Sequence, residues 1–509
     1  MASGGFPMVG SYGSSRYVFL NCGQQGFTYT PPTGYKALNS ANLPDPTINF
    51  GNQHFNTILY TANGQVRSLT GVGFQPDWVW IKSRIGGQNN ALFDSVRGVN
   101  RQLRSDTSGQ EISNRTNLLT SFDSDGFSLG TDSNVGDVNY NSQPHVAWNW
   151  NAGNTDSATY TVKVVSDSGN KYRFNDFGTS AVTLDLAEGG TYTFDGSDSS
   201  MSGHPFVIGT AANGSVYSTG VIYQLDGASV TYSAYTSGYS SATTRKLIIT
   251  VPASAPQLYY WCSLHSGMGG AINTNTSLGS SNFDGSIQST VKVNTTAGFS
   301  IVTYTGTAAN ATIGHGLGVK PEAVLLKRRT GGDSDWMVFH KVTGNTKNLR
   351  LNLSGGTHTT SNIWNNTDPT SSAINIGTSS AVNASGSTYV AYVLSGVTGD
   401  SKFGSYNGNG NANGPFIFTG FRPAWVMTVI YSSSGFDWAV HDSTRNPFNL
   451  VDRKLNPNNN AQEQTDYDKY DFLSNGFKPR VSDPGINAST GSYVYFAFAE
   501  SPFKHARAR

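Results

Sequence analysis

The stretch GVGFQPDWVWIKSR (residues 71–84) recurs in this chain in recognisable form. Its counterparts are GLGVKPEAVLLKRR (316–329) and TGFRPAWVMTVIY (419–431). Each copy places a proline ahead of an apolar run rich in β-forming residues, and glycine, asparagine and aspartate bound these runs. Such runs are typical of buried strands.

A second landmark follows each copy at a nearly constant distance. The closing strands are PHVAWNW, TYVAYVL and SYVYFAF. Counted from Pro76 to Ala147, from Pro321 to Ala391 and from Pro423 to Ala497, the separations are 71, 70 and 74 residues. Landmarks in the same order at the same spacing indicate an internal repeat of about 100 residues.

The repeats and the segments between them divide the chain of 509 residues, which is too long for one hydrophobic core. We expect six segments: an N-terminal segment 1–55, repeat 1 (56–155), an unrelated insert (156–275), a polar linker (276–297), repeat 2 (298–400) and repeat 3 (401–509). Long helical periodicity is absent, so the predicted fold class is all-β, with β-sandwich or jelly-roll-like domains in tandem. Repeats 2 and 3 follow each other directly and are expected to pack as a pair.

Composition excludes several classes of partner. Charged residues are 13% of the chain, against about 25% in an average protein, and the net charge is +1. No run of clustered Lys and Arg suggests nucleic-acid binding, apart from the short tail KHARAR. No apolar run approaches the length that spans a bilayer, and the N-terminus lacks the pattern of a signal peptide. Cys22 and Cys262 lie in different predicted domains, so no disulfide is indicated.

The insert carries the motif with the clearest chemistry, YYWCSLHSGMGGA (259–271). Cys262, His265 and Met268 stand three residues apart on a predicted loop after a strand, and His204 lies upstream in SGHPFVIG. One thiolate, two imidazoles and a thioether are the ligands of a blue-copper site. We expect His204 to come from a strand of the opposite sheet. The insert thereby resembles the cupredoxins, which implies a Greek-key β-sandwich and copper as the cofactor.

A plainer interpretation of the same residues stays open. Beside Tyr259, Tyr260 and Trp261, Cys262 is also a suitable buried apolar residue, and His265 a suitable hydrogen-bonded turn residue. No partner redox centre is visible in the sequence, so we hypothesise that bound copper would stabilise the loop rather than carry electrons.

Two further patterns have a functional and a structural interpretation. Asp94 and Arg97 recur as Asp442 and Arg445, but repeat 2 has His340 and Thr343 instead. This degeneracy favours a structural ion pair or a turn over an acid–base site. The tryptophans of the repeats are suited to stack on sugars if exposed, but their positions on strands favour core packing. These are Trp78, Trp148 and Trp425.

Longer segments resemble a domain family of virion proteins in marine, cyanophage-like tailed phages. The segments are FNTILYTANGQVRSLTGVGFQPDWVWIKSR, SKFGSYNGNG, GPFIFTGFRPAWVM, FLSNGFKPR and INASTGSYVYFAFAESPFK. YVFLNCGQQGFTYTPPTGYKALNSANLP resembles the end of a truncated SPRY-like module. The resemblance implies a structural component of the virion, assembled in the host cytoplasm, and no established active site.

The expected function is therefore that of an exposed tail or fibre-type protein that takes part in host attachment. Two alternatives remain: a head-decoration or neck protein that stabilises the capsid, and a copper-binding redox protein of the cupredoxin type. Expected partners are other virion proteins, further copies of the chain in a trimer or ring, and a host-surface glycan or receptor. The sequence contains no P-loop, no Ser-His-Asp pattern and no paired carboxylates at hydrolase spacing, so we expect no catalytic residues and no enzymatic activity.

Overall fold

The computed structural model of the chain describes residues 45–131, 137–140, 142–153, 157–274 and 279–504, together with 25, 26, 28–30, 32, 33 and 42. Of the described residues, 42% lie in strands and 5% in helices, which confirms the all-β prediction. The helical elements are η2 (Gly51–Gln53), η3 (Ser199–Met201), α1 (Tyr232–Gly238), α2 (Ser380–Asn383) and α3 (Pro484–Asn487). Within the described ranges, none of these helices has the length and apolar character needed to cross a membrane.

Each repeat is a sandwich of a large inner sheet and a small outer sheet. In repeat 1 the inner sheet is β1 (Phe55–Thr61), β8 (Pro144–Trp150), β3 (Trp78–Ser83), β4 (Ala91–Asp94) and β5 (Leu103–Arg104), and the outer sheet is β2 (Arg67–Thr70), β7 (Gly126–Leu129) and β6 (Leu119–Asp123). In repeat 2 the inner sheet is β20 (Ser280–Asn282), β21 (Ser289–Asn294), β22 (Phe299–Thr305), β29 (Thr388–Leu394), β24 (Ala323–Arg328), β25 (Met337–His340), β26 (Lys347–Arg350) and β27 (His358–Thr359), and the outer sheet is β23 (Ala311–Gly314) and β28 (Ala373–Ile376). In repeat 3 the inner sheet is β30 (Ser401–Asn407), β36 (Ser492–Pro502), β32 (Phe421–Ile430) and β33 (Ala439–Asp442), and the outer sheet is β31 (Ile417–Phe418), β35 (Gly476–Pro479) and β34 (Tyr470–Leu473).

The three inner sheets bury one hydrophobic core between them. This shared core takes residues from all three repeats, including Trp78, Tyr392 and Trp425, whereas a separate core lies between the two sheets of each repeat. The rings of Trp78 and Tyr392 stack at 4.2 Å across the junction of repeats 1 and 2. Trp78, Trp148 and Trp425 are each at most 2% exposed. Core packing is confirmed for all three tryptophans, and stacking on sugars is excluded as their role.

One hydrogen bond recurs at all three junctions between repeats. In each repeat, the residue directly before β4, β25 or β33 donates a hydrogen bond from its side chain to a main-chain oxygen of another repeat. The pairs are Trp336 to Arg104 (2.8 Å), Trp438 to Arg350 (3.1 Å) and Asn90 to Asn456 (3.2 Å). Because repeat 2 bonds to repeat 1, repeat 3 to repeat 2, and repeat 1 to repeat 3, the repeats form a closed ring with approximate threefold symmetry. Repeats 2 and 3 therefore pack against each other, as expected, and repeat 1 completes the ring by contacting both.

Strand pairing also corrects the alignment of repeat 3. Ile81 pairs with Ala147 and Leu326 with Ala391, while the equivalent Thr428 pairs with Tyr495. Tyr495, rather than Ala497, is therefore the counterpart of the two alanines, and its distance from Pro423 is 72 residues. A slip of two residues keeps every side chain on its own face of the strand, so the apolar pattern does not reveal it.

The repeated Asp–Arg motif is a buried ion pair at the junctions, as the structural interpretation predicted. Both side chains of the Asp442–Arg445 pair are fully buried, with Nε and Oδ2 2.5 Å apart. Asp442 also accepts a hydrogen bond of 3.0 Å from the indole of Trp148 in repeat 1, and Glu463 joins Arg445 to Arg84 of repeat 1. Asp94, Arg97 and Glu111 form the same network with Arg329 and Tyr392 of repeat 2.

At the third junction, between repeats 2 and 3, the charged residues are replaced. His340 occupies the aspartate position, packs its ring against Phe496 and approaches the main-chain oxygen of Tyr495 at 3.4 Å. Burial lowers the pKa of His340 to about 3, so this imidazole is neutral at physiological pH. Neutral contacts therefore replace the ion pair, which explains why the motif is degenerate in repeat 2.

Of the predicted segments, the linker 276–297 needs correction, and most of the N-terminal segment 1–55 lies outside the described residues. The polar linker 276–297 was wrong in its described part, because β20 and β21 extend the inner sheet of repeat 2 through regular antiparallel pairing. The alternating Val291 and Val293 in this Ser- and Thr-rich stretch supply apolar side chains to that sheet. Most of the segment 1–55, including Cys22, lies outside the described residues, so the SPRY-like prediction is not tested; Cys262 is a free thiol.

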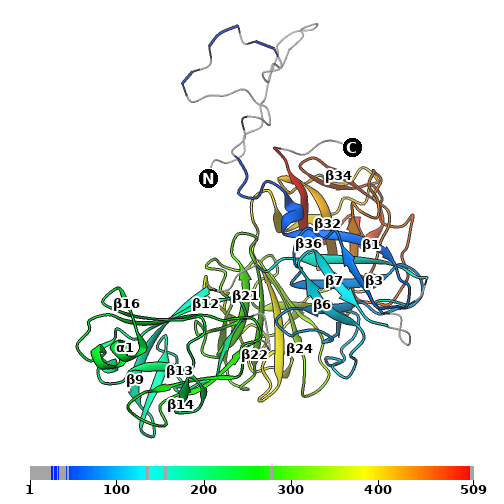
Figure 1. The fold of residues 1–509 in the computed structure, drawn as a ribbon. Coiled ribbons are helices and arrows are strands. Elements are labelled where there is room, and N and C mark those ends of the chain that lie inside the picture. The colour runs from blue at the N-terminus through cyan, green and yellow to red at the C-terminus, as the bar shows by residue number, and fades with distance from the viewer. Residues whose placement is uncertain are drawn as a thin grey trace.

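The insert forms its own two-sheet sandwich and projects to one side of the repeats (Figure 1). One sheet is β10 (Asn170–Phe174), β9 (Ser157–Ser166), β12 (Thr191–Asp195), β17 (Arg245–Thr250), β15 (Val221–Leu225) and β16 (Ala228–Val230). The other is β11 (Leu184–Leu186), β19 (Gly270–Thr274), β18 (Leu258–Cys262), β13 (Phe206–Ala211) and β14 (Gly214–Val216). β11 and β12 belong to opposite sheets, and both contribute apolar side chains to the core of the insert.

We expect Lys327→Met to stabilise the protein at pH 7. Lys327 is fully buried, its Nζ donates to the main-chain oxygens of Ser108 (2.9 Å) and Ser334 (2.7 Å), and burial lowers its pKa to about 8. That shift from 10.5 corresponds to about 3 kcal/mol, of which about 1–2 kcal/mol is offset because the variant leaves the Ser334 carbonyl unpaired, whereas the Ser108 carbonyl keeps the main-chain N–H of Ser334. Repeat 3 has Val429 at the equivalent position, so an apolar residue fits this site.

The stabilisation expected from Lys327→Met should depend on pH. Between pH 8 and 10.5 the unfolded state retains the proton that folded Lys327 has lost, so wild-type stability rises with pH and the advantage of Lys327→Met shrinks. Chemical denaturation at pH 7 and at pH 9.5 measures both effects, with exposed Lys347→Met as the control. A variant less stable than wild type at pH 7 would contradict the expectation.

Candidate metal centre

The candidate ligands meet at one end of the insert, where two paired strands terminate. β13 and β18 are antiparallel neighbours, with Phe206 opposite Cys262. His204, two residues before β13, therefore lies beside Cys262, the last residue of β18. The expectation that His204 belongs to the opposite sheet was wrong, because direct pairing within one sheet makes this contact.

Three of the four predicted ligands are close together. Sγ of Cys262 lies 3.5 Å from Nδ1 of His265 and 3.9 Å from Nδ1 of His204. The two imidazole rings have centroids 4.6 Å apart, and all three ligand atoms lie within 4.8 Å of one another. These separations suit a shared ion held by bonds of about 2.0–2.3 Å.

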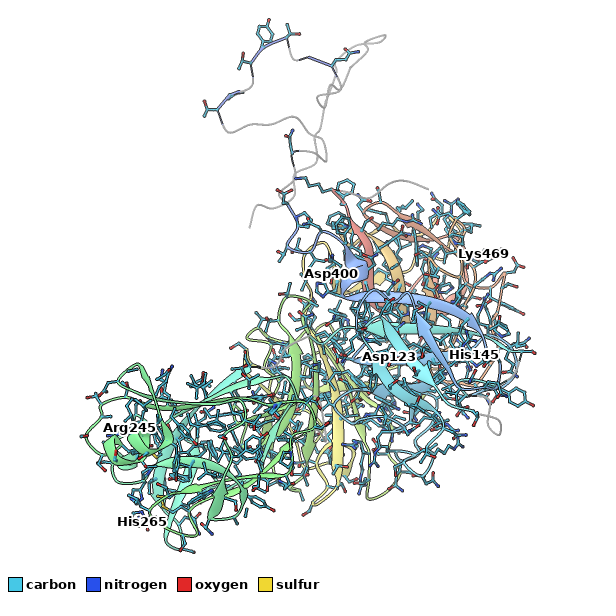
Figure 2. The ribbon with its side chains drawn as sticks, viewed as in Figure 1. Asp123, His145, Arg245, His265, Asp400 and Lys469 are labelled. Carbon is cyan, nitrogen blue, oxygen red and sulfur yellow. The ribbon has the colours of Figure 1, made fainter. Side chains whose placement is uncertain are left out.

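The burial of the ligands is graded. Cys262 and Met268 are each 1% exposed and belong to the hydrophobic core of the insert, His204 is partly buried, and His265 is exposed. Figure 2 places His265 at the edge of the insert, away from the repeats. Burial, followed by the neighbouring His265, lowers the pKa of His204. At neutral pH this favours the neutral imidazole, which is the form that binds metals.

The loop 263–269 is held by contacts that the sequence did not predict. Ser263 donates its main-chain N–H to Pro205, and Gly267 donates to the side chain of Asn213 at 3.0 Å. Gly267 has φ +75°, a conformation that favours glycine. On β10, the hydroxyl of Tyr172 donates to the main-chain oxygen of His204 at 3.0 Å, and its N–H donates to Met268 at 2.9 Å.

These contacts fix the approach of the two ligand segments before any ion binds. Tyr172 is fully buried and bonds to the segments of both His204 and Met268. Burial, and next the Cys262 thiol, raise the pKa of the Tyr172 hydroxyl, so it remains a donor. Nothing in the sequence marked Tyr172 or Asn213, because each reaches the loop from a distant strand or turn.

The donor set determines which ions fit. A thiolate is a soft ligand and suits copper or zinc, whereas oxygen-seeking ions such as Mg²⁺ and Ca²⁺ have no carboxylate here. Among the described residues, this is the group of three His, Cys, Asp or Glu side chains placed to share an ion. The residues present therefore fit the copper that the sequence predicts.

Comparison with known proteins adds a family without a function. The family described as "Domain of unknown function (DUF7483)" matches residues 51–185 and 273–502, which is most of the chain. The interval 186–272 holds all four candidate ligands and lies outside the match. No curated protein and no solved structure matches the chain.

Proposed function

The chain belongs to the DUF7483 family, and we propose that it is a structural component of a tailed-phage virion, an exposed tail or fibre-type protein that takes part in host attachment. Its location would be the virion, assembled in the host cytoplasm. Its partners would be other virion proteins, further copies of the chain, and a host-surface glycan or receptor. The proposal includes no enzymatic activity.

The observation that supports this proposal is the closed ring of three repeats around one core. Phage appendages are commonly symmetric oligomers, and a ring with approximate threefold symmetry in one chain offers the same geometry without assembly from subunits. The ring is held by buried apolar side chains and by buried, mutually bonded charges. Such contacts are screened less by salt than surface ion pairs, which suits a particle that persists outside the cell.

Labelling of purified virions tests the location. An antibody against this chain, detected by electron microscopy with gold, should mark the tail or its fibres. Labelling confined to the head shell or neck would favour the alternative of a head-decoration or neck protein, and particles without label would contradict both. Preimmune serum on the same particles is the control.

A second function, copper binding by the insert, is supported by a specific observation: the facing arrangement of His204, Cys262 and His265. Met268 would complete the set from the same buried loop end. Bound copper would supply a thiolate–metal bond that ties the loop to β13. The chain's own residues position that bond, since Tyr172 holds the His204 segment and Asn213 holds the loop. We propose a stabilising role rather than electron transfer.

A further inference from the structure

A cavity of about 540 Å³ lies at the other end of the molecule, where repeats 2 and 3 meet. Figure 2 labels Asp400, whose neighbours Gly399 and Ser401 line the cavity near the points where the chain enters and leaves the repeats. Its walls include Lys341, Lys402 and Phe418. The volume is within the range of about 300–1,000 Å³ typical of small-ligand sites.

The cavity carries one uncompensated positive charge. Lys341 pairs with Glu322 at 2.8 Å, and Lys504 pairs with Asp45 at 2.6 Å. Lys402 is the third ammonium group, and no ion pair joins it to a carboxylate within the described part of the chain. Its Nζ donates to the main-chain oxygen of Phe418 at 2.8 Å, which leaves N–H groups for a ligand.

The apolar part of the wall is formed by Phe418 and Phe503 with two prolines. Phe418 is 53% exposed, so its ring is accessible to a ligand. The ammonium group of Lys402 lies 5.0 Å from the centroid of its ring. The ammonium group therefore lies over the Phe418 ring, and the exposed part of that ring remains accessible to a ligand.

Comparison among the repeats indicates that the fold does not require this pairing. By strand register, the counterparts of Phe418 are Thr70 and Gly314, and those of Lys402 are Asn56 and Ser300. The same backbone thus accepts small or neutral residues at both positions. The combination is specific to repeat 3 within the described residues.

We propose that this cavity binds a carboxylate-bearing pyranose, a sugar of the uronic acid type. The carboxylate would bind Lys402, the apolar face of the sugar would pack on the exposed part of Phe418 that Lys402 does not cover, and sugar hydroxyls would bond to Glu322 and Thr398, which also line the cavity. A single net positive charge matches a carboxylate monoanion better than a phosphate, which carries about two charges.

Two sources would present this chemistry. One is a free sugar acid, and the other is the end of an acidic polysaccharide on a host surface. The second source rests on the proposed role in host attachment, whereas the site itself does not.

Calorimetric titration of the full chain with D-galacturonate tests the site, with D-galactose as the neutral probe of the same shape. We expect galactose to bind at least 10-fold more weakly. Lys402→Asn and Phe418→Thr copy residues of repeat 1, so they should fold, and each should weaken galacturonate binding at least 10-fold. Lys347→Met removes a lysine outside the cavity and should leave binding unchanged. Absence of galacturonate binding by wild type, or equal binding by Lys402→Asn, would overturn the proposal.

A second titration, with oligogalacturonate, separates the sources. Tighter binding of the oligomer than of the free acid assigns the cavity to polysaccharide ends, and binding of the free acid alone assigns it to a small metabolite; either result retains the sugar-acid site. Virion labelling is independent of both titrations. Failure of the cavity proposal therefore leaves the virion location standing, and the reverse also holds.

Discussion

Asp442→Ala should destabilise the protein by about 3–5 kcal/mol, the usual cost of removing one partner of a buried ion pair. Asp442 and Arg445 are both fully buried, and the variant leaves the guanidinium without its closest carboxylate. It also removes the acceptor of the Trp148 indole in repeat 1, so the loss falls on the junction of repeats 3 and 1. Guanidinium denaturation followed by tryptophan fluorescence measures the change.

The chain contains its own control for this variant. Asp442→His combined with Arg445→Thr copies His340 and Thr343 of repeat 2 and leaves no unpaired Arg445 charge. We expect the double variant to lose only about 1–2 kcal/mol, mainly from the unpaired Trp148 indole. A double variant less stable than Asp442→Ala, or a single variant within about 1 kcal/mol of wild type, would contradict a buried ion pair that supports the junction.

The repeats themselves were predictable from sequence because their landmarks are local. Prolines, apolar runs and glycine turns indicated three similar β units, and runs such as Trp78–Ile81 correctly indicated buried strands, which the structure buries on both faces. The sequence did not reveal what covers the second face. A continuous apolar run shows that both faces of a strand are buried but not which part of the chain covers each face. Three separate sandwiches and three sandwiches packed around a common core therefore give the same pattern of apolar residues.

The buried aspartates show why the contacts between repeats could not be predicted from the sequence. Asp94 and Asp442 each bond within their own repeat and to an aromatic side chain of the next, Tyr392 or Trp148. The sequence indicated the ion pair within each repeat, because the arginine follows the aspartate by three residues. The second contact spans about 300 residues and depends on the ring closing, so only the structure shows it.

For the candidate metal centre, the sequence identified the ligands but not their support. Cys262 and His265 are neighbours in sequence, and His204 was chosen by residue type; the structure brings the three together. The assignment of His204 to the wrong sheet arose because a sequence does not state which strands pair. Tyr172 carries no motif, and its importance follows from two hydrogen bonds to distant segments.

Cys262→Ser should abolish an intense visible absorption band that we expect when the wild-type protein is loaded with Cu(II). The band would arise from charge transfer between the thiolate and copper, so a hydroxyl at the same position cannot produce it. Copper should also raise the melting temperature of the wild-type insert, because an ion at 1,000 times its Kd stabilises the folded state by about 4 kcal/mol. Absorption spectra and thermal unfolding with and without copper measure the two effects.

The matched control is His358→Gln, which removes an exposed imidazole outside the candidate metal centre and should retain both band and stabilisation. His265→Gln should lose most of the stabilisation, since Nδ1 of His265 is the imidazole nitrogen nearest to Sγ of Cys262. A wild-type sample that stays colourless and melts at the same temperature with copper would favour the plainer interpretation, in which Cys262 is a buried apolar residue. Equal stabilisation of wild type and Cys262→Ser would place the bound copper elsewhere, because the buried thiol is the soft ligand on which this centre depends.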